Sequence, residues 1–166
     1  MKRILALDIG DRRIGVALSD TLDILATPLT IIDRKKDELD VASIVDLVKK
    51  HDAGLILAGL PRSLSGGIGQ QAEKVQAFVE KLKQQTNVPI EFRDERFTTV
   101  DAQLLMREAG TKNKRTKIKN KNKSGVTPRR QKTKKEKMHD DAAAAAVLLQ
   151  GYLDEQAPAR QTEGKI

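Results

Sequence analysis

Three acidic positions, far apart along the chain, could bind a divalent metal together. Asp8 lies inside the apolar run at residues 4–9, where a carboxylate is costly unless it is paired or binds a metal. Gly10 lies two residues later, and its missing side chain lets a ligand approach the backbone closely, so we expect it to contact substrate. The alternative is that backbone N–H groups of the following turn satisfy Asp8.

Glu95 is the second acidic position, and it follows a predicted strand that ends at Arg93. Sites in open α/β sheets form where strands end. Because side chains alternate along a strand, Glu91, Arg93 and Glu95 share one face. Taken alone, however, the segment is more typical of an ordinary charged strand end in which Arg96 forms an ion pair.

Asp141 is the third position, and it lies with Asp140 at the start of a predicted helix. Acids stabilise the N-terminal end of a helix dipole, so a capping role is the alternative reading. Helix register separates the two residues. Asp141 begins an apolar stripe that continues with Ala145, Leu148 and Tyr152, whereas Asp140 is rotated by about 100° and is the better candidate for the cap.

Three inward carboxylates suit Mg²⁺ or Mn²⁺, which prefer oxygen ligands. Such ions can activate water and stabilise the leaving oxygen in phosphodiester hydrolysis. The chain has no Cys and only two His, which excludes thiolate metal sites, Cys nucleophiles and His-rich sites. The residues therefore predict a hydrolase acting on ester bonds, with Asp8, Glu95 and Asp141 as metal ligands and catalytic residues.

Positive charge is concentrated in one segment. Residues 111–137 contain 13 Lys or Arg and one Glu, a local charge of +12, so the rest of the chain carries −4. Such a block indicates a polyanionic partner, most simply nucleic acid, although a solvated loop without a partner is the alternative. The expected substrate-binding cations in this block are Lys112, Lys114, Arg115, Arg129 and Arg130.

Hydrophobic periodicity predicts an α/β domain that positions these residues. The predicted strands cover residues 4–9, 14–18, 24–32, 54–60 and 89–93, and the predicted helices cover 37–51, 70–85, 98–109 and 140–154. The order predicts a mixed five-stranded sheet, three antiparallel strands followed by parallel ones, flanked by helices. We expect one domain at residues 1–156 with a flexible basic loop at 111–137, and a polar tail at 157–166.

Several blocks in this order resemble the YqgF family, also called RuvX. They are residues 5–10 with 14–17, residues 59–61 with Gly66, residues 94–102, and Asp141 with the Ala run that follows it. The Asp-Glu-Arg-x-(Ser/Thr)-Thr block is specific, and the resemblance covers nearly the whole chain. Asp8, Glu95 and Asp141 match the family's acidic positions, and Arg62 and Arg96 fall where substrate phosphates would be contacted.

The resemblance implies an RNase H-like fold and a bacterial cytoplasmic nuclease that matures the 5′ end of the 16S ribosomal RNA precursor. An older label of the family is Holliday junction resolvase. The chain departs from related junction resolvases in one respect, because they place a catalytic acid after the fourth strand. Residues 59–61 are Gly-Leu-Pro here, so Glu95 on the fifth strand must substitute. The basic segment is also longer than usual for the family.

Other functions remain open at the level of sequence. A Holliday junction resolvase would take branched DNA, and a non-catalytic RNA-binding assembly factor would bind ribosomal particles without cleavage. An actin-like or sugar-kinase-like ATPase is disfavoured because it needs two such domains.

Few aromatic residues are present, so contacts to the nucleic-acid backbone should dominate over base stacking. We find no signal peptide or membrane span and expect a cytoplasmic protein, either monomer or dimer.

Overall fold

The computed structural model describes residues 2–61, 69–94 and 134–163, and describes the side chains of the last helix at residues 142–157. A single sheet contains five strands, β1 (Arg3–Ile9), β2 (Arg13–Ser19), β3 (Ala26–Asp33), β4 (Ala53–Leu60) and β5 (Ile90–Asp94), in the order β3-β2-β1-β4-β5. The pairs β1–β2 and β2–β3 are antiparallel, whereas β1–β4 and β4–β5 are parallel. The predicted mixed sheet is confirmed.

Strand order follows from composition. β1 is apolar on both faces and lies at the centre of the sheet, where both faces are covered. β3 contains Pro28, which has no N–H to donate to a second neighbour, and this strand lies at the edge.

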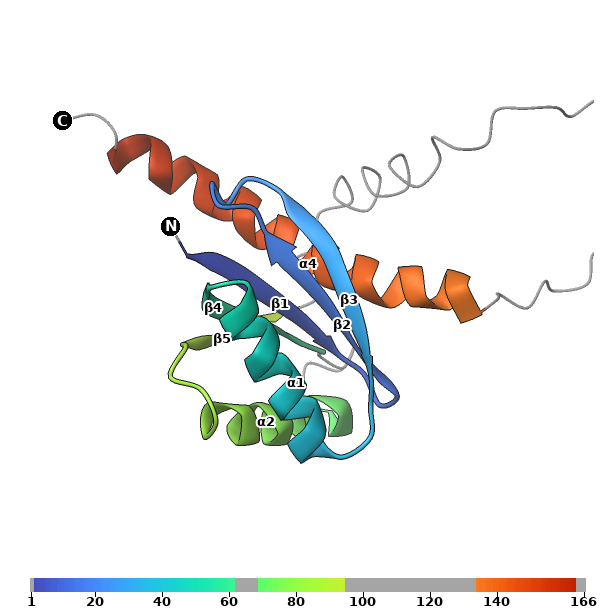
Figure 1. Ribbon diagram of the computed structural model, residues 1–166. Coiled ribbons are helices and arrows are strands. Elements are labelled where there is room, and N and C mark those ends of the chain that lie inside the picture. Colours follow the sequence, from blue (N-terminus) through green and yellow to red (C-terminus); the bar gives the residue numbers. More distant parts are fainter. Residues whose placement is uncertain (1, 62–68, 95–133, 164–166) are drawn as a thin grey trace, which may run out of the picture.

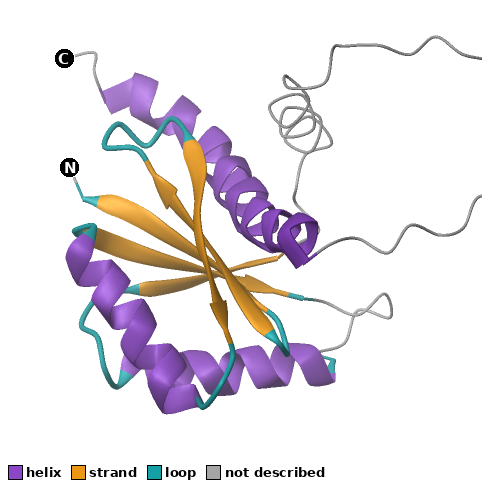
Figure 2. Ribbon diagram, turned by 45° about the vertical axis from the view of Figure 1, so that its right-hand side comes forward, coloured by secondary structure: helices purple, strands orange, loops and turns teal. Residues whose placement is uncertain are grey.

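Helices cover both faces of the sheet (Figure 1 and Figure 2). α1 (Asp37–Lys50) and α2 (Gln70–Lys83) pack on one face over a core that includes Leu5, Leu7 and Phe78. α4 (Lys134–Glu163) crosses the other face over β1, β2 and β3, where a second core includes Ile4 and Ala6. None of the helices in the described ranges is long and apolar enough to cross a membrane.

The structure corrects the bounds of the last predicted helix. α4 extends beyond the predicted 140–154 at both ends, taking in residues 134–137 of the predicted loop and most of the predicted tail. Its terminal residues are largely Lys, Glu, Gln and Ala, which are good helix formers, so polar composition alone could not distinguish a loop from an exposed helix. The buried stripe of α1 is formed by Val41, Ile44 and Val48, and Leu39 lies outside it and is exposed.

Candidate metal centre

Asp8 lies near the carboxyl end of β1, on the face of the sheet that α4 covers. Ile4 and Ala6 precede it on that face and are buried in the core beneath α4, whereas Leu5 and Leu7 face α1 and α2. The Asp8 side chain is half-buried. Side chains therefore alternate between the two faces along β1, and this alternation directs the Asp8 carboxylate toward the α4 layer.

Glycine lies beside Asp8 on both neighbouring strands. Gly15 on β2 is its registered partner. On β4, Ala58 is the partner of Leu7, so the next residue, Gly59, lies beside Asp8 in the parallel pair. Both glycines are buried. Because neither carries a side chain, the two positions in register with Asp8 place no side chain beside its carboxylate on the α4 face.

α4 approaches the sheet through alanines. Ala145 and Ala146 are fully buried against Ala6 and Ala17, and small side chains on both sides allow this close packing. Within the predicted stripe, Ala145 and Leu148 are buried and Tyr152 packs against the same core, as expected. Asp141 belongs to α4 and precedes Ala145 by four residues, about one helical turn, but its side chain lies outside the described set.

A salt bridge between Arg93 and Glu155 connects β5 to α4. The Arg93 Nη1 and Nη2 donate to Glu155 Oε2 and Oε1 at 2.8 and 2.6 Å, and the Tyr152 hydroxyl donates to Glu91 at 3.2 Å. The Arg93 guanidinium also lies 5.9 Å from the Tyr152 ring centroid. Glu91 and Arg93 thus share the α4 face, as alternation predicted. Glu95, two residues beyond Arg93, lies outside the described residues.

The pair makes stability depend on pH. Hydrogen bonds from Arg93 hold the pKa of the Glu155 carboxyl below its ordinary value. A carboxyl with a depressed pKa in the folded state stabilises the fold above its unfolded pKa and loses that contribution as pH falls through the folded pKa. We expect Glu155→Gln to lower the free energy of unfolding by about 1 kcal/mol at pH 7, discounted because Glu155 is half-exposed, and by much less at acid pH.

Denaturant titrations of wild type and variant across this pH range measure that difference. Glu80→Gln is the matched control, because Glu80 pairs only with exposed Lys83 on α2 among the bonds described. An equal loss for Glu155→Gln at neutral and acid pH would contradict the assigned pairing.

The turn after Asp8 requires glycine at position 10. The Gly10 N–H donates to the Arg13 carbonyl at 2.9 Å, closing the β1–β2 turn. A Cβ atom at Gly10 would lie 2.9 Å from that same carbonyl oxygen, too close for any other residue without movement of the backbone. The requirement shown here is structural, and contact of Gly10 with substrate stays a prediction.

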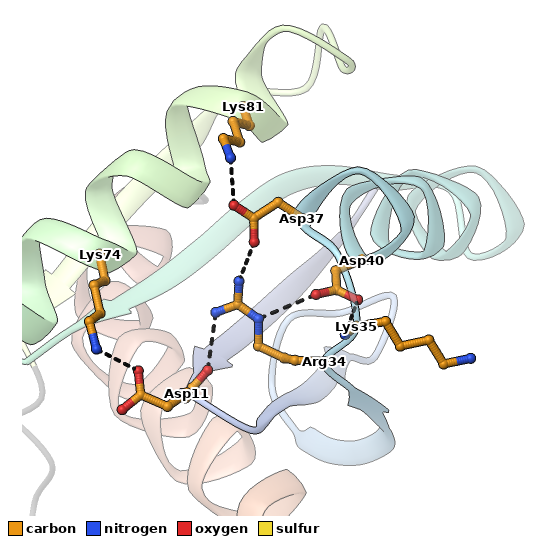
Figure 3. Close-up of polar contacts among 8 residues, drawn as sticks. Asp11, Arg34, Lys35, Asp37, Asp40, Lys74 and Lys81 are labelled. Atoms are coloured by element: carbon orange, nitrogen blue, oxygen red, sulfur yellow. Dashed lines mark hydrogen bonds and ion pairs between the residues drawn. The ribbon is translucent and has the colours of Figure 1, made fainter.

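The turn also has a partner that sequence analysis missed. The side chain of Arg34, which follows β3, donates from Nη1 to the Gly10 carbonyl at 3.2 Å (Figure 3). In the sequence Arg34 stands before Lys35 and Lys36, and such a cluster is typical of a solvated surface. No sequence signal distinguished it from its neighbours.

Most predicted substrate contacts lie outside the described residues. Those outside the described residues are Arg62, Arg96, Lys112, Lys114, Arg115, Arg129 and Arg130. Among the side chains that are described, no three His, Cys, Asp or Glu residues gather closely enough to hold a metal. The described part of the centre is therefore Asp8 with its flanking glycines, facing the helix that carries Asp141.

Comparison with known families decides the membership of the chain. A family model described as RuvX, Holliday junction resolvase, matches residues 2–124. This chain belongs to the RuvX family. Two similar proteins carry the name "Putative pre-16S rRNA nuclease". The one from Dehalococcoides mccartyi is 48% identical over 90% of this chain and 96% of its own length. The one from Clostridium acetobutylicum is 41% identical over 92% and 98%.

Solved structures agree on the fold. The RuvC protein of T. thermophilus in complex with a Holliday junction matches with a TM-score of 0.55 and 10% identity, covering 96% of each chain. The yeast mitochondrial Holliday junction resolvase matches with a TM-score of 0.57 and 12% identity, covering 96% of this chain and 81% of its own. This RuvX-family chain has the RNase H-like fold, and its family and relatives support the nuclease function expected from the sequence.

Proposed function

We propose that this chain is an endonuclease that hydrolyses phosphodiester bonds in the precursor of 16S ribosomal RNA, at its 5′ end, during ribosome biogenesis in the cytoplasm. The observation that carries the proposal is the position of Asp8: an acid at the carboxyl end of the central strand, flanked by Gly15 and Gly59. The proposal is further supported by the name "Putative pre-16S rRNA nuclease", which is shared by relatives that match almost all of the chain.

We assign Asp8, Glu95 and Asp141 as ligands of Mg²⁺ or Mn²⁺. The Asp8 carboxylate is a hard oxygen donor of the kind that these ions prefer. Asp141 precedes Ala145 by about one turn of α4, and Ala145 is buried against the sheet, so helix register supports this assignment. If the alternation of Glu91 and Arg93 extends by two more residues, Glu95 lies on the same face. The three carboxylates offer only oxygen ligands, which fit Mg²⁺ or Mn²⁺.

The bound ion would activate a water molecule and neutralise charge on the phosphate that is cleaved. The chain's own residues do the positioning. The Asp8 carboxylate would hold the ion at the strand end, where its neighbours Gly15 and Gly59 carry no side chain. The Arg93–Glu155 pair holds the end of β5 against α4, where Glu95 follows. Catalysis in such a site comes from fixed geometry and charge.

Substrate phosphates would be contacted near the centre by Gly10, Arg62 and Arg96. The basic segment would bind along the RNA backbone through Lys112, Lys114, Arg115, Arg129 and Arg130, within a precursor that is part of a ribosomal particle. The charge of this segment supports that assignment, because phosphate contacts dominate nucleic-acid affinity.

Cleavage of branched DNA is a second candidate function, and the description of the matching family as a Holliday junction resolvase favours it. The two functions share one site and differ in substrate. Purified protein is incubated with Mg²⁺ and either the 5′ region of precursor 16S RNA or a four-way DNA junction. We expect cleavage of the RNA at a defined position and, on the junction, a rate at least about tenfold lower.

Mature 16S RNA of the same length and a linear DNA duplex are the matched substrates. Faster cleavage of the junction than of the RNA would favour the resolvase. Binding of the RNA without cleavage, by wild type and Asp8→Asn alike, would make the protein a non-catalytic assembly factor.

A further inference from the structure

Arg34 connects four separate parts of the fold. It follows β3, and its guanidinium donates from Nε to Asp40 at 3.3 Å and from Nη2 to Asp37 at 2.6 Å, both on α1. The third nitrogen, Nη1, donates to the Gly10 carbonyl at 3.2 Å, in the turn that follows β1. The same guanidinium lies 4.8 Å from the centroid of the Phe78 ring on α2.

The guanidinium is fixed in place from the α1 side. Asp40 is buried, and its other oxygen accepts from the Lys35 N–H at 3.2 Å. Asp37 also accepts from Lys81 on α2 at 2.6 Å, as Figure 3 shows. Lys81 holds the pKa of the Asp37 carboxyl below its ordinary value, with a smaller effect from Arg34. Two charged carboxylates therefore orient Arg34, and a planar guanidinium held this way has little freedom left.

The guanidinium nitrogen that does not bond to these carboxylates, Nη1, faces the β1–β2 turn. The Arg34 backbone N–H donates to the Arg12 carbonyl at 2.9 Å, and Nη1 donates to the Gly10 carbonyl. One residue thus holds the turn at two points. Gly10 is two residues beyond Asp8, and its own N–H closes the turn onto Arg13. Displacement of the Gly10 carbonyl would move the end of β1.

We propose that Arg34 is a positioning residue that sets the β1–β2 turn and through it the Asp8 carboxylate and its metal. This inference rests on the proposed function, because it takes Asp8 as a metal ligand. Groups that orient a metal ligand typically change metal affinity or activity by 10- to 100-fold when they are removed. If Arg34 only connected β3 to α1, its replacement would lower the stability of the fold and leave metal affinity unchanged.

The test uses Mn²⁺ alone as the probe, added to the metal-free protein and followed by titration calorimetry. We expect Arg34→Gln to raise the Kd for Mn²⁺ by about 10- to 100-fold. Amide hydrogen exchange in the absence of metal should show reduced protection of the Gly10 N–H. In cleavage assays, kcat should fall at saturating RNA while KM stays close to that of wild type. Unchanged Mn²⁺ affinity with reduced stability would overturn the proposal.

Arg34→Lys carries the test if Arg34→Gln does not fold. One ammonium keeps the charge near Asp37 and Asp40 but cannot also reach Gly10 in the planar geometry of a guanidinium. We expect weaker Mn²⁺ binding in this variant too, and wild-type affinity would overturn the proposal. Lys81→Met is the matched control. It breaks the far end of the same network without touching the turn, so Mn²⁺ affinity should stay within about twofold of wild type.

Asp8→Asn distinguishes failure of the proposed metal site from failure of the proposed role of Arg34. Loss of Mn²⁺ binding in Asp8→Asn together with wild-type binding in both Arg34 variants would leave the proposed metal site standing and reject the role of Arg34. Wild-type Mn²⁺ binding in Asp8→Asn would reject the metal site itself.

Discussion

Asp8→Asn is expected to reduce metal-dependent cleavage by about a thousandfold or more while binding of RNA is retained. The variant keeps the size and half-buried position of the side chain but removes the negative charge that would hold the ion at the end of β1. Electrostatic stabilisation by a bound metal contributes several kcal/mol to a transition state, and about 4 kcal/mol corresponds to a thousandfold in rate. Single-turnover cleavage in Mg²⁺ measures the rate, and filter binding without metal measures affinity.

Asp46→Asn provides the matched control for the charge change. Asp46 is exposed on α1, which packs on the opposite face of the sheet from α4. The account predicts a rate close to that of wild type for this variant. Equal cleavage by Asp8→Asn and Asp46→Asn would remove Asp8 from the site, and an equal loss of RNA affinity in both would indicate a general charge effect.

The second large effect is expected from the basic segment. Replacing Lys112, Lys114, Arg115, Arg129 and Arg130 by glutamine leaves the length of the chain unchanged and stops before α4, which begins at Lys134. Each cation that neutralises a phosphate contributes about 0.7 to 0.9 to the slope of log affinity against log salt, so removing five of them should flatten the slope by about 4. At low salt, affinity for RNA should fall on the order of a hundredfold or more.

Five exposed lysines in the layer of α1 and α2 provide a control with the same change in net charge. These are Lys35, Lys36, Lys49, Lys50 and Lys83. Their replacement by glutamine should change the salt slope by less than about 1, because they lie away from the α4 face. Equal flattening by both sets would mean that net charge alone governs binding and that the basic segment has no specific role.

The fold was predictable because its strongest signals are local. The apolar residues on both faces of β1 are typical of a central strand, and Pro28 in β3 is typical of an edge strand, and the two strands occupy those positions. The alternation of side chains along a strand also accounts for Ile4 and Ala6 on one face and Leu5 and Leu7 on the other. Burial within such strands and helices depends on spacing, which a sequence displays directly.

The environment of Asp8 was harder to predict from the sequence, because it depends on the register between strands. Gly15 and Gly59 become its neighbours only once β1 is paired with β2 and β4, and the sequence blocks that contain them do not show this pairing. Arg34 was missed for a similar reason. Its partners Asp37 and Asp40 lie in the first turn of α1, where acids are typical of helix-dipole stabilisation and needed no further explanation.

The most direct test of the metal centre is the location of Mn²⁺ by anomalous X-ray diffraction from crystals of the wild-type protein grown with that ion. We expect Mn²⁺ within coordination distance of a carboxylate oxygen of Asp8, with Glu95 and Asp141 completing the protein ligands. Mn²⁺ bound elsewhere, with none of these three carboxylates in contact, in crystals of a preparation that cleaves RNA would contradict it.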